Sequence, residues 1–584
     1  MKALISASCF FLAVGSALAQ APAPDSRVAP PVVVRKTVQT TDGQTLEGRV
    51  LNEGMADLQL RTDDQRIHLL RKATGDRYRA VTSQRDWTTY HGDPGGNRYS
   101  TLTQIDKSNV ARLAPRWVFP IPNVGNVETT PVVVDGIMYI SSANEVYALD
   151  AGSGRQMWHY QRPRTKGLIG NAAGGINRGV AISGERVFLL TDHAHMIAIN
   201  RFTSELLWDT EMADWRQNYN GTSAPLVVGN LVISGTAGGD EGVRGFVAAY
   251  DTATGKEAWR FWTVPNPGEP GSETWQGKQT EHRGGASWMT GTYDSQLDLV
   301  YWPTGNPGLD YFGDERLGDN LYSDSVVALE AKTGKLRWHF QFTPHDIHDW
   351  DAQEPPVLLD TNWRGQPRKL LIQANRNGFF YVFDRTNGEL LLAKQFLKNL
   401  NWAKGIDRTG RPILNDLKAD ANGETYVCPG FQGGTNWFST SFNPVTGLYY
   451  FQALERCNLF TKRDMEWQAG RGFMGGAARP APGETFTKSL RAINIQTGDV
   501  AWDLVQGSGP VTASAGVIST ASGLVFFGEN SGSFMAADAA SGKVLWDFPT
   551  NHVWKASPMT YVFDNKQYIA IAVGQSITAF GLPD

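Results

Sequence analysis

The chain has 584 residues, of which 41% are hydrophobic and 62 are glycine, and its formal net charge is only -4. This composition is typical of a large folded protein with many tight turns, and it excludes a fibrous or disordered chain. Because the net charge is small and no long run of Lys and Arg occurs, nothing favours nucleic acid or an anionic membrane surface as a partner. Small or weakly charged ligands are the better expectation.

The first residues read MKALISASCFFLAVGSALAQ, with one lysine, an apolar run and then Ala17-Leu18-Ala19. This is the layout of a cleaved secretory signal, so we predict a signal peptide over residues 1–19 and export to the periplasm. An uncleaved anchor is the alternative, but the apolar run is short and ends in a cleavage site. No later apolar run reaches the roughly 20 residues of a membrane-spanning helix.

Residues 20–35 are rich in Ala, Pro and Val and are predicted to be a linker. In residues 36–85, Asp-Gly and Asn-Glu-Gly turns separate short alternating runs. Such turns between alternating runs are typical of antiparallel strands. We therefore expect a small β module there, whose role the sequence does not reveal.

Cysteine usage follows from the predicted export. Removal of the signal peptide would leave Cys428 and Cys457 in an oxidising compartment, where a disulfide is expected and a free buried pair is the alternative. No Cys-x-x-Cys-His motif occurs, so no covalently attached c-type haem is expected.

Residues 86–584 contain a repeat. An acidic residue or Asn begins a turn that usually ends in Thr-Gly or Ser-Gly, and Trp follows eight positions after that first residue. The pairs are Asp150/Trp158, Asn200/Trp208, Asp251/Trp259, Glu330/Trp338, Asn494/Trp502 and Asp538/Trp546. Asp384 begins a seventh such turn but has Leu392 in place of Trp. Two or three β-rich runs precede each turn, so one unit is a four-stranded meander.

Seven units are complete, and an eighth at the end of the chain stops after its third strand. Residues 112–119, RLAPRWVF, precede the first unit and can supply the missing strand. This closure would leave no free sheet edge. We therefore predict an all-β fold, an eight-bladed β-propeller of four-stranded sheets after the small β module, with the repeat Trp side chains packed between blades.

Polar residues are expected to converge on one face of this propeller. Loops between second and third strands, and crossings from one blade to the next, meet there near the axis. These segments carry Glu128, Arg178, Thr222, Asp240, Trp288, Asn306, Asp349, Asp351 and Arg376. Carboxylate and amide oxygens suit a hard cation such as calcium. Capping of backbone amides by the carboxylates is the structural alternative, and zinc on His345 and His348 is another.

Several motifs occur in a fixed order: NRGVA at 177–181, GVRGFVAAYDTATGK at 242–256, TGNP at 304–307, TPHD and DWD within 343–351, NGFFYVFDRTNG at 377–388 and SPMTY at 557–561. From about residue 86 onwards the chain resembles the secreted quinoprotein alcohol dehydrogenases, which include methanol and ethanol dehydrogenases. The resemblance implies an eight-bladed propeller that uses pyrroloquinoline quinone and one metal ion. Several independent matches are far more specific than a single glycine motif.

The resemblance also implies roles for individual residues. Asp349 would be the catalytic base and a metal ligand, and Asp240, Asn306 and Asp351 would complete the metal site. Asp351 would also select the metal, with a lanthanide favoured and calcium as the alternative. Trp288 would support the cofactor ring. The full set of expected cofactor contacts is Glu128, Arg178, Thr222, Gly238, Gly239, Trp288, Arg376 and Asn401.

Three positions depart from the family pattern. An adjacent cysteine pair is absent from NAAGGINRGV at 171–180, a family Thr is Ala286, and a late family Trp is Ser514. These differences predict an altered upper wall of the cofactor site and an altered substrate pocket. The substrate class therefore stays open between primary alcohols and polyols or sugars.

The expected function is oxidation of an alcohol by hydride transfer to metal-bound quinone, with electrons passed to a separate periplasmic cytochrome c. The alternative is a cofactor-free propeller that serves as a binding scaffold, since the fold supports both.

Overall fold

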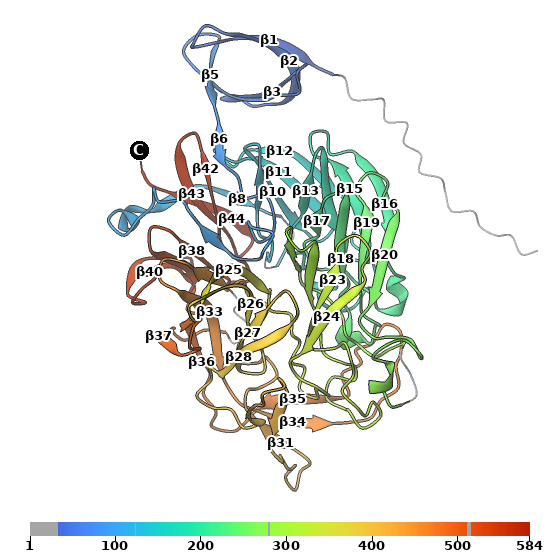
Figure 1. Ribbon diagram of the computed structural model, residues 1–584. Helices are drawn as coiled ribbons and strands as arrows, with labels where there is room; N and C mark the ends of the chain where they lie inside the picture. The colour runs from blue at the N-terminus through green and yellow to red at the C-terminus, as the bar shows by residue number, and fades with distance from the viewer. Residues whose placement is uncertain (1–32, 123, 126, 278–280, 511–514, 584) are drawn as a thin grey trace, which may run out of the picture.

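The computed structural model describes residues 33–122, 124–125, 127–277, 281–510 and 515–583 (Figure 1). The predicted signal peptide and most of the predicted linker lie outside the described residues. Six four-stranded and two five-stranded sheets make up the large body of the protein. The all-β prediction and the prediction of eight blades are confirmed.

The first four blades are continuous meanders. Blade 1 contains β9 (Val132–Val134), β10 (Ile137–Ser142), β11 (Glu145–Asp150) and β12 (Gln156–Gln161). Blade 2 contains β13 (Ala181–Ser183), β14 (Arg186–Leu190), β15 (His195–Asn200) and β16 (Leu206–Glu211). Blade 3 contains β17 (Leu226–Val228), β18 (Leu231–Gly235), β19 (Phe246–Asp251) and β20 (Glu257–Trp262). Blade 4 contains β21 (Thr292–Asp294), β22 (Leu299–Pro303), β23 (Ser325–Glu330) and β24 (Leu336–Gln341).

The next two blades carry longer excursions. Blade 5 contains β25 (Val357–Trp363), β26 (Gln366–Ala374), β27 (Phe379–Asp384) and β28 (Glu389–Gln395). Blade 6 contains β32 (Ser441–Asn443), β33 (Leu448–Glu455), β36 (Thr487–Asn494) and β37 (Val500–Val505). Two small sheets project from this region, one of β29 (Ala403–Ile406) and β30 (Pro412–Leu414), the other of β31 (Thr425–Val427), β34 (Asn458–Lys462) and β35 (Gly476–Pro480).

The last two blades join the two ends of the propeller. Blade 7 contains β38 (Val517–Thr520), β39 (Leu524–Gly528), β40 (Ser533–Asp538) and β41 (Val544–Pro549), with β7 (Tyr99–Ser100) added at its inner edge. Blade 8 contains β42 (Met559–Phe563), β43 (Lys566–Val573) and β44 (Ser576–Gly581), and β8 (Ala114–Pro120) is its fourth strand. The predicted closure by residues 112–119 is therefore confirmed.

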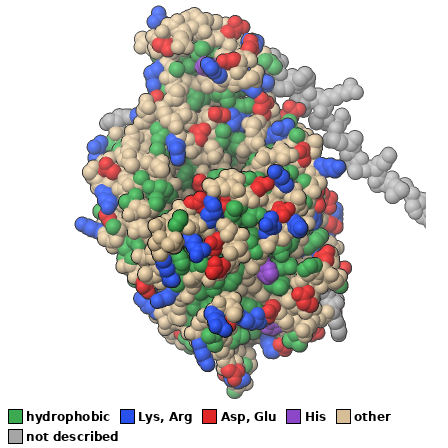
Figure 2. Space-filling view, in the orientation of Figure 1, with side chains coloured by type: hydrophobic (Ala, Val, Ile, Leu, Met, Phe, Trp, Pro, Cys, Tyr) green, Lys and Arg blue, Asp and Glu red, His purple; other side chains and the backbone are tan. Residues whose placement is uncertain are grey.

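Short 3-10 helices occur only in connections of the described chain, at η1 (Val110–Arg112), η2 (Asn171–Gly174), η3 (Trp215–Gln217), η4 (Gly239–Glu241) and η5 (Ser272–Thr274). None of the described helices is long and apolar enough to cross a membrane. Figure 2 shows acidic and basic side chains interspersed over the visible face, in keeping with the small net charge.

The segment predicted as a small β module forms a closed barrel of β1 (Arg35–Thr40), β2 (Thr45–Glu53), β3 (Asp57–Thr62), β4 (Ile67–Lys72) and β5 (Arg77–Val81). It lies at one end of the molecule (Figure 1), and Arg71 and Arg79 anchor it to Asp150 at 2.7 Å and Asp564 at 2.6 Å. The strand that follows, β6 (Ser83–Arg85), pairs with β42. The pairing thus places the end of the barrel before residue 83, whereas the sequence pattern suggested 85.

Neighbouring blades are joined by tryptophan indoles. The Trp Nε1 of each fourth strand donates to a main-chain oxygen of the next blade over 2.8–3.3 Å, with donors Trp117, Trp158, Trp208, Trp259, Trp338, Trp502 and Trp546. In blade 5, where Leu392 replaces the repeat Trp, Trp363 of β25 donates to Ile495 instead, at 3.2 Å. The predicted packing of these residues between blades is confirmed, and the bonds form an unbroken ring.

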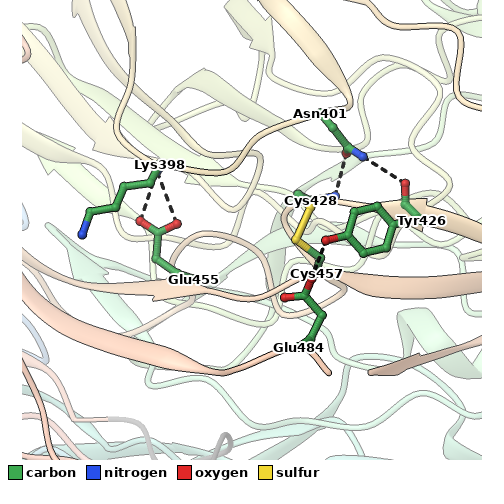
Figure 3. The surroundings of a disulfide bond; sticks show 7 residues. All are labelled: Lys398, Asn401, Tyr426, Cys428, Glu455, Cys457 and Glu484. Carbon is green, nitrogen blue, oxygen red and sulfur yellow. Dashed lines mark hydrogen bonds between the residues drawn. A yellow bond between two sulfur atoms is a disulfide. The ribbon is translucent and has the colours of Figure 1, made fainter. Parts of the chain in front are cut away.

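The two cysteines of the described chain form a disulfide, Cys428–Cys457, with Cα atoms 4.4 Å apart (Figure 3). Cys428 directly follows β31 and Cys457 directly precedes β34, so the bond fastens the ends of two paired strands. The predicted disulfide is confirmed.

Candidate functional site

A buried cavity of about 290 Å³ lies among the connections between blades and the loops between second and third strands. Every predicted site residue except Asn306 and Asn401 lines it: Glu128, Arg178, Thr222, Gly238, Gly239, Asp240, Trp288, Asp349, Asp351 and Arg376. Its volume is close to the lower limit of ordinary small-molecule sites, which are roughly 300–1,000 Å³. The fold thus brings together residues that lie far apart in the sequence, such as Glu128 and Arg376.

The loop that carries Asp349 and Asp351 is fixed by its own aspartate, Asp346. The Asp346 carboxylate accepts the main-chain N–H groups of His348 at 3.1 Å and Trp350 at 2.8 Å. Asp349 takes a left-handed backbone conformation, with φ of +62°, which Asp adopts more readily than most residues. Asp346 thus fastens the loop, and Asp349 and Asp351 are left to line the cavity.

Arg376 is the central cation of this end of the cavity. Its Nη1 donates to the Asp349 main-chain oxygen at 2.7 Å and lies 3.6 Å from Asp349 Oδ1, and its Nη2 lies 3.1 Å from Asp351 Oδ2. Asp351 Oδ1 also accepts the Asn306 main-chain N–H at 3.0 Å, and Trp288 Nε1 donates to Oδ2 at 3.3 Å. The carboxylate of Asp351 is therefore engaged by protein donors at both oxygens.

Asn306 is buried in the loop that follows β22 and does not itself line the cavity. Its Nδ2 donates to Asp310 Oδ1 at 2.8 Å, which fixes the amide orientation and directs Oδ1 away from Asp310. A Cβ placed on Gly239 would be 3.9 Å from that oxygen, so Asn306 Oδ1 faces the turn that holds Asp240. The second oxygen of Asp310 is buried and has no hydrogen-bond partner among the described residues.

These carboxylates are electrostatically incompatible unless a cation compensates them. Burial, then the charges of Asp240 and Asp349, hold the pKa of Asp310 well above its usual value, and burial with Asp240 does the same for Asp349. Burial also raises the pKa of Asp240 itself, although Arg376 opposes it. Buried carboxylates that repel one another, with one oxygen left unpartnered, fit a hard cation bound to oxygen ligands.

The described side chains do not by themselves form a closed cluster of three His, Cys, Asp or Glu ligands. The predicted metal set of Asp240, Asn306, Asp349 and Asp351 includes an amide, and a cation would have to draw its members together. The zinc alternative has no support in the described structure. His345 Nδ1 lies 3.0 Å from the Gly318 oxygen, and His348 stacks on Trp350 with ring centres 4.3 Å apart.

The turn at Asp240 brings the main chain close to the cavity. Gly238 has a φ of +113°, and a Cβ there would lie 2.7 Å from the Asn218 oxygen, so a larger residue would displace the turn. A long connection between β34 and β35 covers this turn from outside. Phe473 N–H donates to the Asp240 oxygen at 2.6 Å, and Trp467 Nε1 donates to the Glu241 oxygen at 3.0 Å.

Aromatic rings and a second arginine form the other part of the cavity. The Arg178 guanidinium lies 4.8 Å from the ring centre of Trp288 and 4.5 Å from that of Trp437. It pairs with Glu128 at 2.9 Å and donates to Thr222 Oγ1 at 2.8 Å. Flat aromatic faces beside buried cations suit a planar anionic ligand, which is the chemistry of a quinone that carries carboxylates.

Asn401, predicted to contact the cofactor, is not among the residues that line the cavity. Its Oδ1 accepts the Cys428 N–H at 2.7 Å and its Nδ2 donates to the Tyr426 oxygen at 3.0 Å (Figure 3). Both ends of the amide thus hold the main chain beside the disulfide. The structure gives Asn401 a role in fixing this strand end, because its donors and acceptors are used there.

The altered wall is visible where the chain departs from the family pattern. Ala286 is buried, and a Cβ on Gly239 would lie 3.4 Å from its methyl group. In place of a cysteine pair, η2 presents Asn171 to the cavity. Ser514 lies outside the described residues.

Three charged residues of the site were missed by sequence reasoning. Asp310 supports Asn306, Glu354 is fully buried with an oxygen 3.9 Å from Arg376 Nε, and Lys555 lines the cavity near Glu128. Asp310 and Lys555 could have been found from the sequence. Asp310 follows the TGNP motif and Lys555 precedes SPMTY, and the propeller topology brings both segments to this face.

Comparison with known proteins agrees with this geometry. A family model described as the β-propeller domain of glucose, ethanol and alcohol dehydrogenases matches residues 87–394 and 504–569. The quinohemoprotein alcohol dehydrogenase ADH IIB of Pseudomonas putida is 37% identical over 516 residues, covering 84% of this chain and 73% of that protein. The 1-butanol dehydrogenase (cytochrome c) of Thauera butanivorans is 34% identical over 528 residues, covering 84% and 74%.

Among solved structures, a europium-containing methanol dehydrogenase superposes with a TM-score of 0.79 at 29% identity, covering 85% of this chain and 98% of that one. The family model, these relatives and the arrangement of the cavity all agree. The chain therefore belongs to the family of quinoprotein alcohol dehydrogenases, which use pyrroloquinoline quinone.

Proposed function

We propose that this protein oxidises an alcohol, either a primary alcohol or a polyol or sugar, with pyrroloquinoline quinone and one metal ion in the cavity described above. The observation that carries the proposal is the convergence of Asp349, Arg376 and Trp288 on one buried cavity beside unpartnered carboxylates. When bound, the quinone supplies a hydride acceptor and the metal ion a Lewis acid.

Asp349 is proposed as the general base that takes the proton of the alcohol hydroxyl group. Burial and the charge of Asp240 raise the pKa of its carboxyl group, while Arg376 lowers it. A cation held by Asp240, Asn306 and Asp349 would add to the effect of Arg376 and keep Asp349 ionised. The contact from Arg376 Nη1 to the Asp349 main-chain oxygen would hold the base in place.

We propose a lanthanide as the metal, with calcium as the alternative. A trivalent ion is better balanced by additional carboxylates, and Asp310, Asp351 and Glu241 lie close to the ligand set. The europium-containing relative supports this preference. Asp351 was predicted to select the metal, yet its contacts with Arg376, Asn306 and Trp288 also fit a residue that fastens the loop.

The electrons are proposed to leave through a separate cytochrome c in the periplasm. The sequence has no Cys-x-x-Cys-His motif, and the name of the Thauera butanivorans relative, 1-butanol dehydrogenase (cytochrome c), includes this carrier. Relatives that are quinohemoproteins show that haem can also be part of the enzyme. A haem assay of the purified protein decides this point: covalently bound haem would contradict a separate carrier.

The test is reconstitution of the purified chain with the quinone and with lanthanum, calcium or no metal. Quinone absorbance that follows the protein through gel filtration, together with alcohol-dependent dye reduction, is the expected result. Full turnover with calcium alone would favour the calcium alternative. A protein that binds neither quinone nor metal would contradict the proposal and favour the cofactor-free scaffold.

A further inference from the structure

The cavity has two regions of opposite charge. At one, Asp240, Glu241, Asp349 and Asp351 face the single cation Arg376. At the other, the single carboxylate of Glu128 faces two cations, Arg178 and Lys555. Trp288 joins the regions, since its Nε1 donates to Asp351 and its ring lies beneath Arg178.

The cationic region is built from three connections between blades. Lys555 lies between β41 and β42, Glu128 between β8 and β9, and Arg178 between β12 and β13. Blades 7, 8, 1 and 2 follow one another around the ring, so these connections are neighbours. None of the three side chains belongs to the metal-binding set, and the two cations exceed the available negative charge.

Arg178 is held rigidly and still has a free donor. Glu128, Thr222 and two tryptophan rings fix its guanidinium, as described above, and the guanidinium as a whole is almost completely buried. Its Nε is nevertheless without a hydrogen-bond partner among the described residues. A buried donor of this kind costs free energy unless a bound group accepts from it.

Lys555 is a half-buried ammonium group on the same wall. Within the described part of the chain, no side chain lies within hydrogen-bond or salt-bridge distance of it, although Glu128 is near enough to favour its charge. Burial and the charge of Arg178 oppose that charge and lower the pKa of Lys555. An anion placed between Lys555 and Arg178 would relieve both effects.

We propose that Lys555, together with Arg178, binds a carboxylate group of the cofactor in the region of the cavity away from the metal. This inference rests on the proposed function, because it takes the quinone as the ligand. Lys555 is then a cofactor-binding residue that offsets Glu128, whose own charge would otherwise repel a carboxylate. It makes no contribution to proton transfer.

The test measures cofactor affinity rather than turnover. Quenching of tryptophan fluorescence by pyrroloquinoline quinone is titrated at saturating lanthanum for the wild type and for Lys555→Met, Lys555→Arg and Lys543→Met. Lys543 is an exposed lysine of the turn between β40 and β41 and does not line the cavity, so it serves as the matched control. Circular dichroism and melting temperature establish that each variant is folded.

We expect Lys555→Met to weaken quinone binding about 10- to 100-fold, as for the loss of one hydrogen bond to a charged group. Lys555→Arg and Lys543→Met should bind within about threefold of the wild type, on the scale of a neutral surface change. The trimethyl ester of the quinone, which carries no carboxylate charge, should bind the wild type and Lys555→Met with equal affinity.

Two outcomes overturn the inference: equal quinone affinity of the wild type and Lys555→Met, or the same loss for the ester as for the quinone. A wild type that takes up no quinone at all instead contradicts the proposed function. A metal affinity that is equal in the wild type and Lys555→Met, measured by terbium luminescence, supports a role confined to the end away from the metal.

Discussion

The joints between blades and the axial cavity use polar groups in opposite ways. At each joint, an indole N–H donates to one main-chain oxygen and both groups are satisfied, as with Trp259 and Ala331 at 3.0 Å. At the cavity, Asp310 Oδ2 beside its wall and Arg178 Nε in its lining are buried and have no hydrogen-bond partner among the described residues. The joints are complete in the protein alone, whereas the cavity is incomplete without a ligand.

We expect the joints to contribute mainly to the stability of the fold and the cavity mainly to binding and turnover. Partnered polar groups and packed rings stabilise the folded chain, so changes at the joints should lower stability and leave chemistry intact. Unpartnered buried charges destabilise the chain until a ligand compensates them, so changes in the cavity should alter binding or turnover with little loss of stability.

Asp349→Asn should separate the two regions most clearly, because it changes a cavity residue and no joint between blades. Loss of a general base typically lowers turnover by roughly 10²–10⁴-fold, so the reconstituted variant should be nearly inactive in dye-linked assays. Its melting temperature without metal should not fall, because a buried charge has been removed. Asp360→Asn, at an exposed aspartate of β25, is the control. Turnover retained by Asp349→Asn would show that another group accepts the proton.

The corresponding change at a joint is Trp259→Ala. Trp259 is 8% exposed, and truncation of such a residue costs about 3–5 kcal/mol of unfolding free energy. Gly334→Ala should also be destabilising, since the glycine has a φ of +68° and a Cβ would lie 2.4 Å from the Trp259 ring. Denaturant unfolding measures both effects. Quinone affinity of the folded fraction should be unchanged, and a specific loss of affinity would contradict the division of roles.

Asp310→Ala tests the support of the metal site. Removing a partner that orients a metal ligand typically lowers metal affinity by about 10- to 100-fold, and here Asn306 would lose its acceptor. Terbium luminescence titration measures the change. Asp314→Ala, four residues along and paired with Lys462 at the surface, is the matched control. Equal metal affinity of the two variants would show that Asp310 does not support the metal site.

The metal-free protein should lose stability as the pH rises from the usual carboxyl pKa towards about 8. Burial raises the pKa of both Glu354 and Glu241 to about 8, so the folded state binds more protons than the unfolded state below that value. The stability that these two carboxyl groups contribute is fully present near their usual pKa, and it is lost as the pH rises to about 8. Bound metal should flatten the dependence on pH.

Glu354→Gln isolates this effect in a series of melting temperatures. The comparison with the variant is needed because Lys488, whose pKa burial lowers to about 7, acts in the opposite direction. We expect the variant to be more stable than the wild type at pH 8 and closer to it at pH 6.5. A wild type that gains more stability with pH than the variant would contradict the assignment.

The joint between blades 5 and 6 depends on Trp363 instead of a repeat Trp, and a change there should have a small effect. Trp363→Phe keeps an aromatic ring but leaves the Ile495 oxygen without its donor, at a cost of about 1 kcal/mol. Trp158→Phe, at a regular joint, should cost a similar amount, because the bond to Arg201 is of the same kind. Denaturant midpoints of the two variants decide whether Trp363 fully replaces the missing Trp.

The blades and their closure can be predicted from the repeat in the sequence. The spacing from Asp150 to Trp158, repeated along the chain, predicts the turn, the fourth strand and the joint, because each repeat packs in the same way on its neighbour. The same pattern predicted that residues 112–119 supply the fourth strand of the last blade. The set of residues on the cavity face followed from topology and from the family motifs.

Which polar atoms have hydrogen-bond partners, by contrast, is seen only in the folded structure. Trp363, from a different strand, replaces the Trp that is missing at Leu392, and Asp351 is held by Arg376 and Trp288. Asn401 binds main-chain groups beside the disulfide, and Lys555 lines the end of the cavity where two cations face the single carboxylate of Glu128. No local pattern encodes these outcomes. They depend on side chains that meet across blades, and the free energy of a buried charge depends on every neighbour that the fold brings within reach.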